Sequence, residues 1–190
     1  MRQETIRGGK GVDAPWIADR QPPDLTVKVR QVKDVKAQDG TVYAASSQAH
    51  SDSGVVEQDV DRFTQHVYKD PETGYEMPYN LYLPKDYDPN KSYPLVFFVA
   101  DASANINNTK TPLFQGNGAT VWTEPEEQAK HPCIVLAPQY TQDLVQSIGM
   151  MTTDENVWTP GLTLVTHLLQ DTIKNYAVDK TRIYGTGQSQ

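Results

Sequence analysis

Short apolar runs without polar alternation constrain the fold of this chain most strongly. Pro94–Ala100 and Cys133–Ala137 are apolar at every position, and Arg182–Gly185 forms a third short run of strand type. A strand that is buried on both faces has this pattern, whereas a half-buried strand alternates between apolar and polar residues. The three runs therefore predict neighbouring strands inside a sheet that is covered on both sides.

The segments between these runs have helical features. Thr123–Glu126 fits a capping box with proline in the first turn, which predicts a helix ending at Ala129 or Lys130. A longer helix is expected to begin near Thr159-Pro160 and to end around Ala177. Its apolar residues recur at steps of three and four and predict one stripe facing the sheet: Leu162, Val165, Leu169, Ile173 and Tyr176. Crossovers of this length permit parallel pairing of the strands.

An antiparallel hairpin is predicted before the first apolar run. Phe63–Tyr68 and Tyr79–Leu83 alternate on either side of Asp70–Gly74, which has the composition of a turn. The order hairpin, strand, helix, strand, helix, strand is that of an α/β fold. We expect parallel strands with crossover helices and an antiparallel strand pair on one side.

The first part of the chain has weaker signals. Residues 1–23 are polar and predict a tail or loop, and Ala44–Gly54 predicts another loop. Short strands are expected at Thr26–Arg30 and Thr41–Tyr43, and Val55–Asp61 is interpreted as a third strand or a connector. These signals are too sparse for a complete β-sandwich, so they predict a partial β domain or a β appendage.

These patterns predict a division of the chain into two parts. Residues 1–61 would contain the tail and the β segment, and residues 62–190 would contain the α/β domain. The formal net charge of −7 argues against nucleic acid or an anionic membrane as partner. No apolar stretch is long enough to span a membrane, and residues 1–10 are too polar for a signal peptide, although a mature exported form has no signal to show.

The residues also indicate that no metal or cofactor takes part. Cys133 is the single cysteine, which excludes an internal disulfide and a CxxC metal site, and its apolar surroundings favour a buried structural thiol. The His, Asp and Glu residues do not have the spacing of metal ligands.

The last residues carry the motif with a chemical meaning. Gly187-Gln188-Ser189-Gln190 directly follows the third apolar strand and begins a G-x-S-x-G pattern. In a nucleophile elbow, a sharp strand-to-helix turn exposes the serine Oγ, and the N–H of the next residue points into an oxyanion hole. Glycines are needed because the turn is strained and other backbone passes close to the serine.

Residues from Phe63 onward resemble the α/β-hydrolase superfamily. Within it, they are similar to bacterial esterases of the polyhydroxybutyrate-depolymerase and feruloyl-esterase type, a group also described as predicted peptidases. Some members carry an N-terminal immunoglobulin-like domain, and residues 25–61 resemble its last strands more weakly. The segments that carry the resemblance are Met77–Pro84, Tyr93–Val96, Trp122–Ala129, Val135–Tyr140 and Tyr184–Ser189.

This resemblance implies a serine carboxylic-ester hydrolase. Ser189 would be the nucleophile, and the oxyanion would be held by the N–H groups of Gln190 and Ala102. The implied substrates are small-molecule or polysaccharide-linked esters of feruloyl, acetyl or polyester type, and the implied location is extracellular or periplasmic, while the residues themselves leave a cytoplasmic location open. Family members commonly have His-Gly before the second donor, whereas this chain has Ala100-Asp101, which adds a negative charge near the oxyanion.

The base and acid of a catalytic triad are not found among these residues. In this fold they follow the serine, whereas the four histidines precede it: His50, His66, His131 and His167. His66 and His167 are interpreted as solvated or core residues. We therefore expect the chain to be one piece of an enzyme, inactive alone, whose final strand is covered by the C-terminal half of the same enzyme or by a second chain.

Two alternatives remain open at this point. One is a serine peptidase of the same fold. The other is a non-catalytic carbohydrate-binding or adhesion module that uses aromatic residues, namely Trp16, Tyr43, Trp122 and Trp158. Packing roles are favoured for these aromatic residues, because Trp122 and Trp158 stand just before predicted helices, where hydrophobic staples occur.

Several loops are expected at the rim of the site. We hypothesise that Asn105–Gly118, which follows the oxyanion loop, shapes the acyl pocket; a solvated surface loop is the alternative. Gln139-Tyr140 and Asp143–Asn156 are expected at the same end of the sheet, because ligands in α/β folds bind at the carboxyl ends of the strands.

Overall fold

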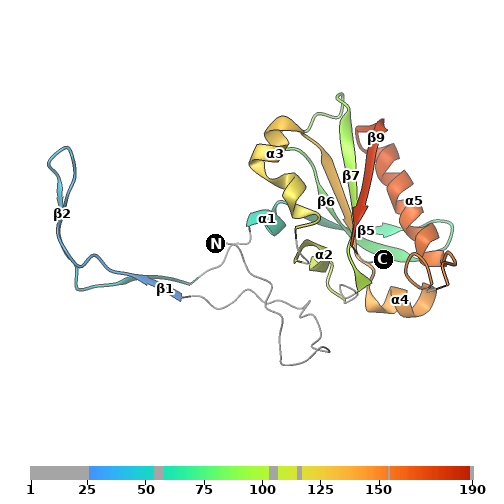
Figure 1. Cartoon of the computed structure of the whole chain (residues 1–190), viewed down its shortest axis with the longest axis horizontal. Helices are drawn as coiled ribbons and strands as arrows, with labels where there is room; N and C mark the ends of the chain where they lie inside the picture. Colours follow the sequence, from blue (N-terminus) through green and yellow to red (C-terminus); the bar gives the residue numbers. More distant parts are fainter. Residues whose placement is uncertain (1–25, 54–57, 103–106, 115–116, 154, 189–190) are drawn as a thin grey trace. The chain divides into compact units, whose positions relative to one another are not determined.

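The computed structural model describes residues 26–53, 58–102, 107–114, 117–153 and 155–188 (Figure 1). The chain divides into two compact units, one of which contains the first four strands and the other everything from Gln58 onward. In the part of the chain that is described, no helix is long and apolar enough to cross a membrane.

The smaller unit contains two antiparallel strand pairs. Strand β1 (Thr26–Val29) pairs with β4 (His50–Ser53), and β2 (Val35–Lys36) pairs with β3 (Val42–Tyr43). The two predicted strands are present as β1 and β3. The prediction of a loop over Ala44–Gly54 is wrong at β4, because its polar sequence gives no alternation and only the pairing with β1 makes it a strand.

The larger unit is built on a five-stranded mixed sheet in the order β5-β6-β8-β7-β9. The strands are β5 (Thr64–Lys69), β6 (Glu76–Tyr82), β7 (Tyr93–Val99), β8 (Ile134–Pro138) and β9 (Val178–Gly187). Strand β6 is antiparallel to both of its neighbours, β5 and β8, and β8, β7 and β9 are parallel. The predicted α/β sheet with an antiparallel hairpin on one side is confirmed.

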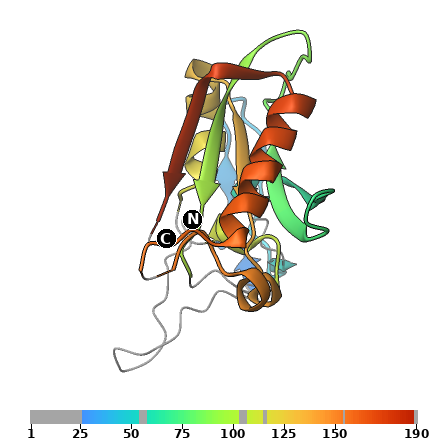
Figure 2. The same cartoon turned by 90° about the vertical axis from the view of Figure 1, so that its right-hand side faces the viewer.

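Helices cover both faces of this sheet (Figures 1 and 2). They are α1 (Gln58–Asp61), α2 (Thr111–Phe114), the 3-10 helix η2 (Thr120–Thr123), α3 (Pro125–Lys130), α4 (Gln142–Ile148) and α5 (Pro160–Asn175). Helices α4 and α5 lie on one face, and α1 and α3 lie on the other. The described part of the predicted strand or connector over Val55–Asp61 is helix α1.

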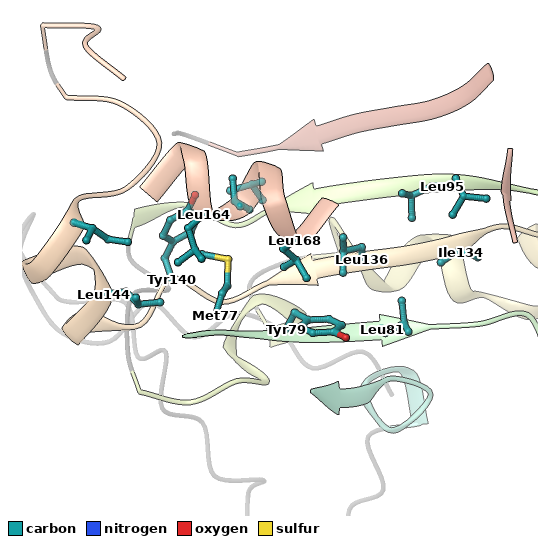
Figure 3. Packing of buried hydrophobic residues seen from close by; sticks show 14 of the residues in the cluster. Met77, Tyr79, Leu81, Leu95, Ile134, Leu136, Tyr140, Leu144, Leu164 and Leu168 are labelled. Carbon is teal, nitrogen blue, oxygen red and sulfur yellow. The ribbon is translucent and has the colours of Figure 1, made fainter. Parts of the chain in front are cut away.

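Strand β7 shows why the apolar runs do not alternate. Its residues Leu95 and Val99 belong to the core cluster beneath α5, whereas Val96 and Phe98 belong to the cluster on the opposite face. Strand β8 divides in the same way between the two clusters. Figure 3 shows the α5 side, where leucines of the helix pack on the strands. Both faces of these strands are therefore buried at most positions, which explains why their residues are apolar without alternation.

Helix α5 begins as predicted. The Thr159 side chain accepts a hydrogen bond from the N–H of Gly161, and Pro160 occupies the first helical position. The predicted apolar stripe packs on the sheet, but the deepest contacts come from Leu164 and Leu168, which have no exposed surface and lie outside that stripe. The buried face of the helix is wider than one stripe of three- and four-residue steps.

The predicted capping box at Thr123 is wrong. Glu124 is the N-cap residue of α3 and makes no side-chain cap. Thr123 instead ends η2, and its hydroxyl donates to the Thr120 carbonyl over 2.8 Å. The Thr123 hydroxyl that a capping box requires is therefore bonded within η2 and does not cap α3.

Trp158 is not a packing residue. Its side chain is 79% exposed, so the staple expected before α5 is absent. Trp122 is 38% exposed and lies within η2, where its indole N–H donates to the Gly118 carbonyl over 3.1 Å.

Candidate active site

The carboxyl ends of β7 and β9 lie side by side and define the candidate site. Val99 is the partner of Gly187 in the parallel register, and the Gln188 N–H donates to the Val99 carbonyl over 3.2 Å. A Cβ atom added to Gly187 would lie 2.9 Å from the Val99 carbonyl oxygen. A side chain at Gly187 would therefore force the two strand ends apart, which explains why the first glycine of the motif is needed.

The predicted oxyanion donors are associated with these two strand ends. Ala102 is exposed and follows β7 by three residues, after the buried Ala100 and Asp101. Ser189 and Gln190 lie outside the described residues, as does Ser103. The structure thus brings together the strands that lead to Ala102 and to Ser189, while Gln190, the other predicted donor, lies outside its described part.

The end of β8 is tied to the first turn of α5. The buried Tyr140 hydroxyl donates to the Gly161 carbonyl over 2.9 Å. Burial raises the pKa of the Tyr140 phenol, so at neutral pH it remains a neutral donor rather than a base. Gln139 is 1% exposed, and its N–H donates to the Pro78 carbonyl over 2.8 Å. The predicted position of Gln139 and Tyr140 at the carboxyl end of the sheet is observed, and both are held by the scaffold.

The loop after Ala102 is anchored at the same end of the sheet. The buried Asn80 side chain donates to the carbonyls of Thr109 (2.6 Å) and Ala137 (3.1 Å). Asn107 donates to the Asp143 carboxylate of α4 over 3.3 Å. The described part of Asn105–Gly118 therefore lies at the carboxyl end, near α4, where it was expected, and its role in the acyl pocket stays a hypothesis. It includes helix α2, which the sequence did not predict.

Sequence reasoning missed a histidine–carboxylate pair, in which Asp70 is buried and His167 is partly buried. His167 Nδ1 of α5 lies 3.0 Å from Asp70 Oδ2 in the β5–β6 turn, and Glu72 lies 3.8 Å from the other ring nitrogen. Burial alone would raise the pKa of Asp70, but hydrogen bonds from Thr73, His167 and the Glu72 N–H lower it to about 2. The hydrogen bond to Asp70 raises the pKa of His167. His167 is therefore neither simply solvated nor an apolar core residue.

This pair cannot act on a substrate at Ser189. It is attached to the β5–β6 turn, and strands β8 and β7 separate β6 from β9. Three strand spacings amount to roughly 14 Å. His66 on β5 stacks on Tyr79 and is more distant still, and His131 follows α3, just before the start of β8 at the opposite end of the sheet. Within the described larger unit, no histidine is placed to serve as the base.

The residues that the structure describes offer no metal centre. They contain no group of three or more His, Cys, Asp and Glu side chains that could hold an ion. Cys133 is 4% exposed, and burial raises the pKa of its thiol, with Gln128 Nε2 lying 3.3 Å from Sγ. The prediction of a buried structural thiol is confirmed.

No protein-family model matches the chain, and no curated protein matches it. The chain is similar to a solved thermostable esterase, with 32% sequence identity and a TM-score of 0.63 over 82% of this chain and 41% of that protein. A ferulic acid esterase matches 66% of this chain and 49% of its own length, with 15% identity and a TM-score of 0.48. A ferulic acid esterase from Anaeromyces mucronatus matches 66% of this chain and 47% of its own length, with 16% identity and a TM-score of 0.43.

The similarity to the thermostable esterase agrees with the sheet topology. The larger unit has the α/β fold of the α/β hydrolases, with parallel strands, crossover helices and an antiparallel pair, and a small antiparallel sheet precedes it. The chain spans about two fifths of the length of the thermostable esterase.

Proposed function

We propose that this chain carries the nucleophile of a serine carboxylic-ester hydrolase. The pairing of Gly187 with Val99 carries the proposal, because it joins the end of the strand leading to Ser189 with the end of the strand leading to Ala102. The oxyanion hole of this fold needs one N–H from each of these two segments. The similarity to a thermostable esterase over 82% of the chain supports the same function.

In the proposed reaction, Ser189 Oγ attacks the ester carbonyl. The developing oxyanion accepts hydrogen bonds from the N–H groups of Ala102 and Gln190, and the alcohol leaves with a proton. Water then attacks the acyl-enzyme, and the acid is released. The backbone donors need no particular side chain, so the substitution of His-Gly by Ala100-Asp101 is compatible with this chemistry. We propose feruloyl, acetyl or polyester-type esters as substrates, met outside the cell or in the periplasm.

We also propose that the triad base and acid come from a segment or chain beyond these 190 residues. The positions of His66, His131 and His167 support this, as does strand β9, which pairs only with β7 in the described structure and is exposed over most of its length. A further strand along β9 would cover this edge and bring the missing groups to the carboxyl end of the sheet. The small unit would then precede the catalytic domain as part of an immunoglobulin-like domain.

The test uses a fluorophosphonate probe and intact-mass measurement. The polypeptide is isolated from its source with whatever continues or accompanies it, and is compared with the isolated 190-residue chain. We expect one adduct on Ser189 and ester hydrolysis in the former, both lost in Ser189→Ala, and no turnover by the latter. Hydrolysis that survives Ser189→Ala would refute the nucleophile. Full Ser189-dependent hydrolysis by the isolated chain would refute the need for a second part.

A further inference from the structure

Trp158 is the most exposed large hydrophobic residue in the described part of the chain, at 79%. It stands between Val157, which is also exposed, and Thr159, the N-cap of α5. Burying an indole would contribute roughly 2 kcal/mol or more, and this fold leaves that contribution unused. An indole exposed to this degree is accessible to a ligand.

The backbone around Trp158 is held firmly. Thr152 and Trp158 form an antiparallel bridge, and the Thr153 N–H donates to the Val157 carbonyl over 2.9 Å. The Thr159 N–H donates to the Met151 carbonyl over 3.2 Å, and the Thr159 hydroxyl bonds to the Met150 carbonyl. Hydrogen bonds thus hold the backbone at Trp158 before any ligand arrives, which lowers the entropy cost of ordering this segment on binding.

This segment also packs against the first turn of α5. A Cβ atom on Gly161 would lie 2.3 Å from the Met150 carbonyl oxygen, so the two backbones touch. The Gly161 carbonyl accepts the Tyr140 hydroxyl from the end of β8. Figures 1 and 2 both show the connection between α4 and α5 beside the carboxyl end of β9. The connection that carries Trp158 therefore lies at the carboxyl end of the sheet, beside the candidate active site.

The neighbours of Trp158 indicate the chemistry of its ligand. Thr152, Thr153, Glu155 and Asn156 are all exposed, and they offer hydroxyl, carboxylate and amide groups. Glu155 is ionised at neutral pH, because hydrogen bonds with Thr153 lower its pKa, and this charge disfavours anionic ligands. A flat apolar face surrounded by polar groups fits a ring with apolar C–H groups on one face and hydroxyl groups around its rim.

We propose that Trp158 is a platform for a neutral sugar ring. The C–H face of the sugar stacks on the indole, and its hydroxyls bond to the polar side chains of Thr152, Thr153, Glu155 and Asn156. An acyl group needs an enclosing pocket, whereas a sugar ring remains hydrated on its outer side and suits an indole that is exposed to this degree. The assignment of this sugar to the alcohol part of the ester rests on the proposed function, and the binding itself does not.

Binding is measured by NMR from the signals of the indole N–H groups of the three tryptophans. The probes are xylohexaose, cellohexaose and sodium 4-hydroxycinnamate. We expect the neutral oligosaccharides to shift one indole signal, which disappears in Trp158→Phe. Trp158→Ala should weaken binding by about tenfold or more, as loss of a stacking partner does elsewhere, while Trp122→Ala, the matched control on η2, should not.

Three results would overturn the proposal. One is that neither oligosaccharide shifts the Trp158 signal, and another is that only the hydroxycinnamate does so. The third is that Trp158→Ala abolishes self-association measured by light scattering while sugars have no effect, which would make the indole a contact between copies. None of these measurements involves ester hydrolysis, so failure of sugar binding and failure of the proposed catalytic function are separate outcomes.

Discussion

The two edge strands of the five-stranded sheet, β5 and β9, are protected in different ways. Strand β5 is short, and charged or polar side chains cover it: Thr64 bonds to the Leu81 carbonyl, and Lys69 pairs with Glu76 of β6 over 2.6 Å. Its turn is fastened to α5 by Asp70 and His167. Strand β9 runs for ten residues, and only its first residue is buried.

This difference indicates which of the two edge strands would also be an edge in a larger sheet. Charges and a fastened turn protect β5 from pairing with other strands, whereas on β9 the charged residues are confined to 179–182 and residues 183–187 carry none. Strand β9 also leaves Ile183 (36%) and Tyr184 (55%) exposed in the described structure. This contrast supports the proposal made above, in which β5 is an edge of the complete sheet and β9 is one of its interior strands.

Asp70→Ala should loosen the β5–β6 turn and have the largest effect on stability. The substitution removes the acceptor of the Thr73 hydroxyl (2.5 Å) and of the Glu72 N–H (3.2 Å), and it leaves His167 without its buried partner. We expect a loss of about 3 kcal/mol in the free energy of unfolding, measured by urea denaturation. The control Glu72→Ala, whose side chain is 74% exposed, should change it by less than about 0.5 kcal/mol. Equal effects of the two variants would contradict the fastening by Asp70.

His167→Gln should show at which pH the interaction between His167 and Asp70 depends on the charge of the histidine. The folded pKa of His167 lies above the usual 6.5, so its pairing contributes stability below pH 6.5 that is lost as the pH rises through the folded pKa. Asp70, with a pKa of about 2, stays ionised over this range and loses its contribution only below pH 4. The destabilisation by His167→Gln should be roughly 1 kcal/mol larger at pH 6 than at pH 9. His131→Gln, at the exposed end of α3, serves as control, and a pH-independent difference for His167→Gln would exclude the charged pair.

Gly187→Ala and Gly185→Ala form a matched pair on β9. The added methyl group at Gly187 meets the Val99 carbonyl at 2.9 Å, whereas nothing lies within 4 Å of one added at Gly185. We expect Gly187→Ala to destabilise the chain by about 1–3 kcal/mol and Gly185→Ala to be neutral or slightly stabilising. Thermal unfolding followed by circular dichroism provides the comparison. Similar midpoints for the two variants would mean that the close contact at Gly187 relaxes without cost.

Tyr184→Lys should show that β9, and not β5, is the edge that associates with other chains. It should have the smallest effect on stability. The matched variant on the other edge is Val67→Lys, since Val67 is 52% exposed on β5. Both should change the free energy of unfolding by less than about 0.5 kcal/mol. Light scattering at rising protein concentration should show less self-association for Tyr184→Lys and no change for Val67→Lys. Less association for Val67→Lys alone would reverse the assignment of the open edge.

The sequence could predict what depends on local or periodic patterns. The hairpin around Asp70–Gly74, the buried strands β7 and β8 and the cap at Thr159 all follow from residues that are close in the chain. The insertion of β8 between β6 and β7 depends on packing between distant segments and leaves no local pattern. The pair of Asp70 and His167 was missed for the same reason, because 97 residues separate the two.

The candidate site shows the same limit. The glycine of the motif was predicted from its spacing to Ser189, and the structure supplies the reason through the Val99 carbonyl. Trp158 was predicted to pack before a helix, because a sequence shows that an aromatic residue precedes a cap but not whether anything lies opposite it. The hydrogen-bonded connection between α4 and α5 leaves Trp158 exposed.

The register between β7 and β9 has one irregularity, and it indicates where β9 could accept inserted residues. The step from Tyr93 to Leu95 on β7 is matched by a step from Val178 to Ile183 on β9. The extra residues form a bulge in which Asp179 accepts from the Thr181 N–H (2.9 Å) and from Arg182 Nε (2.6 Å). The bulge separates the end of the α5 crossover from the register at Gly187. A short peptide tag inserted after Lys180 should therefore enlarge the bulge and leave Gly187 opposite Val99. This position is thus suited to the insertion of a label.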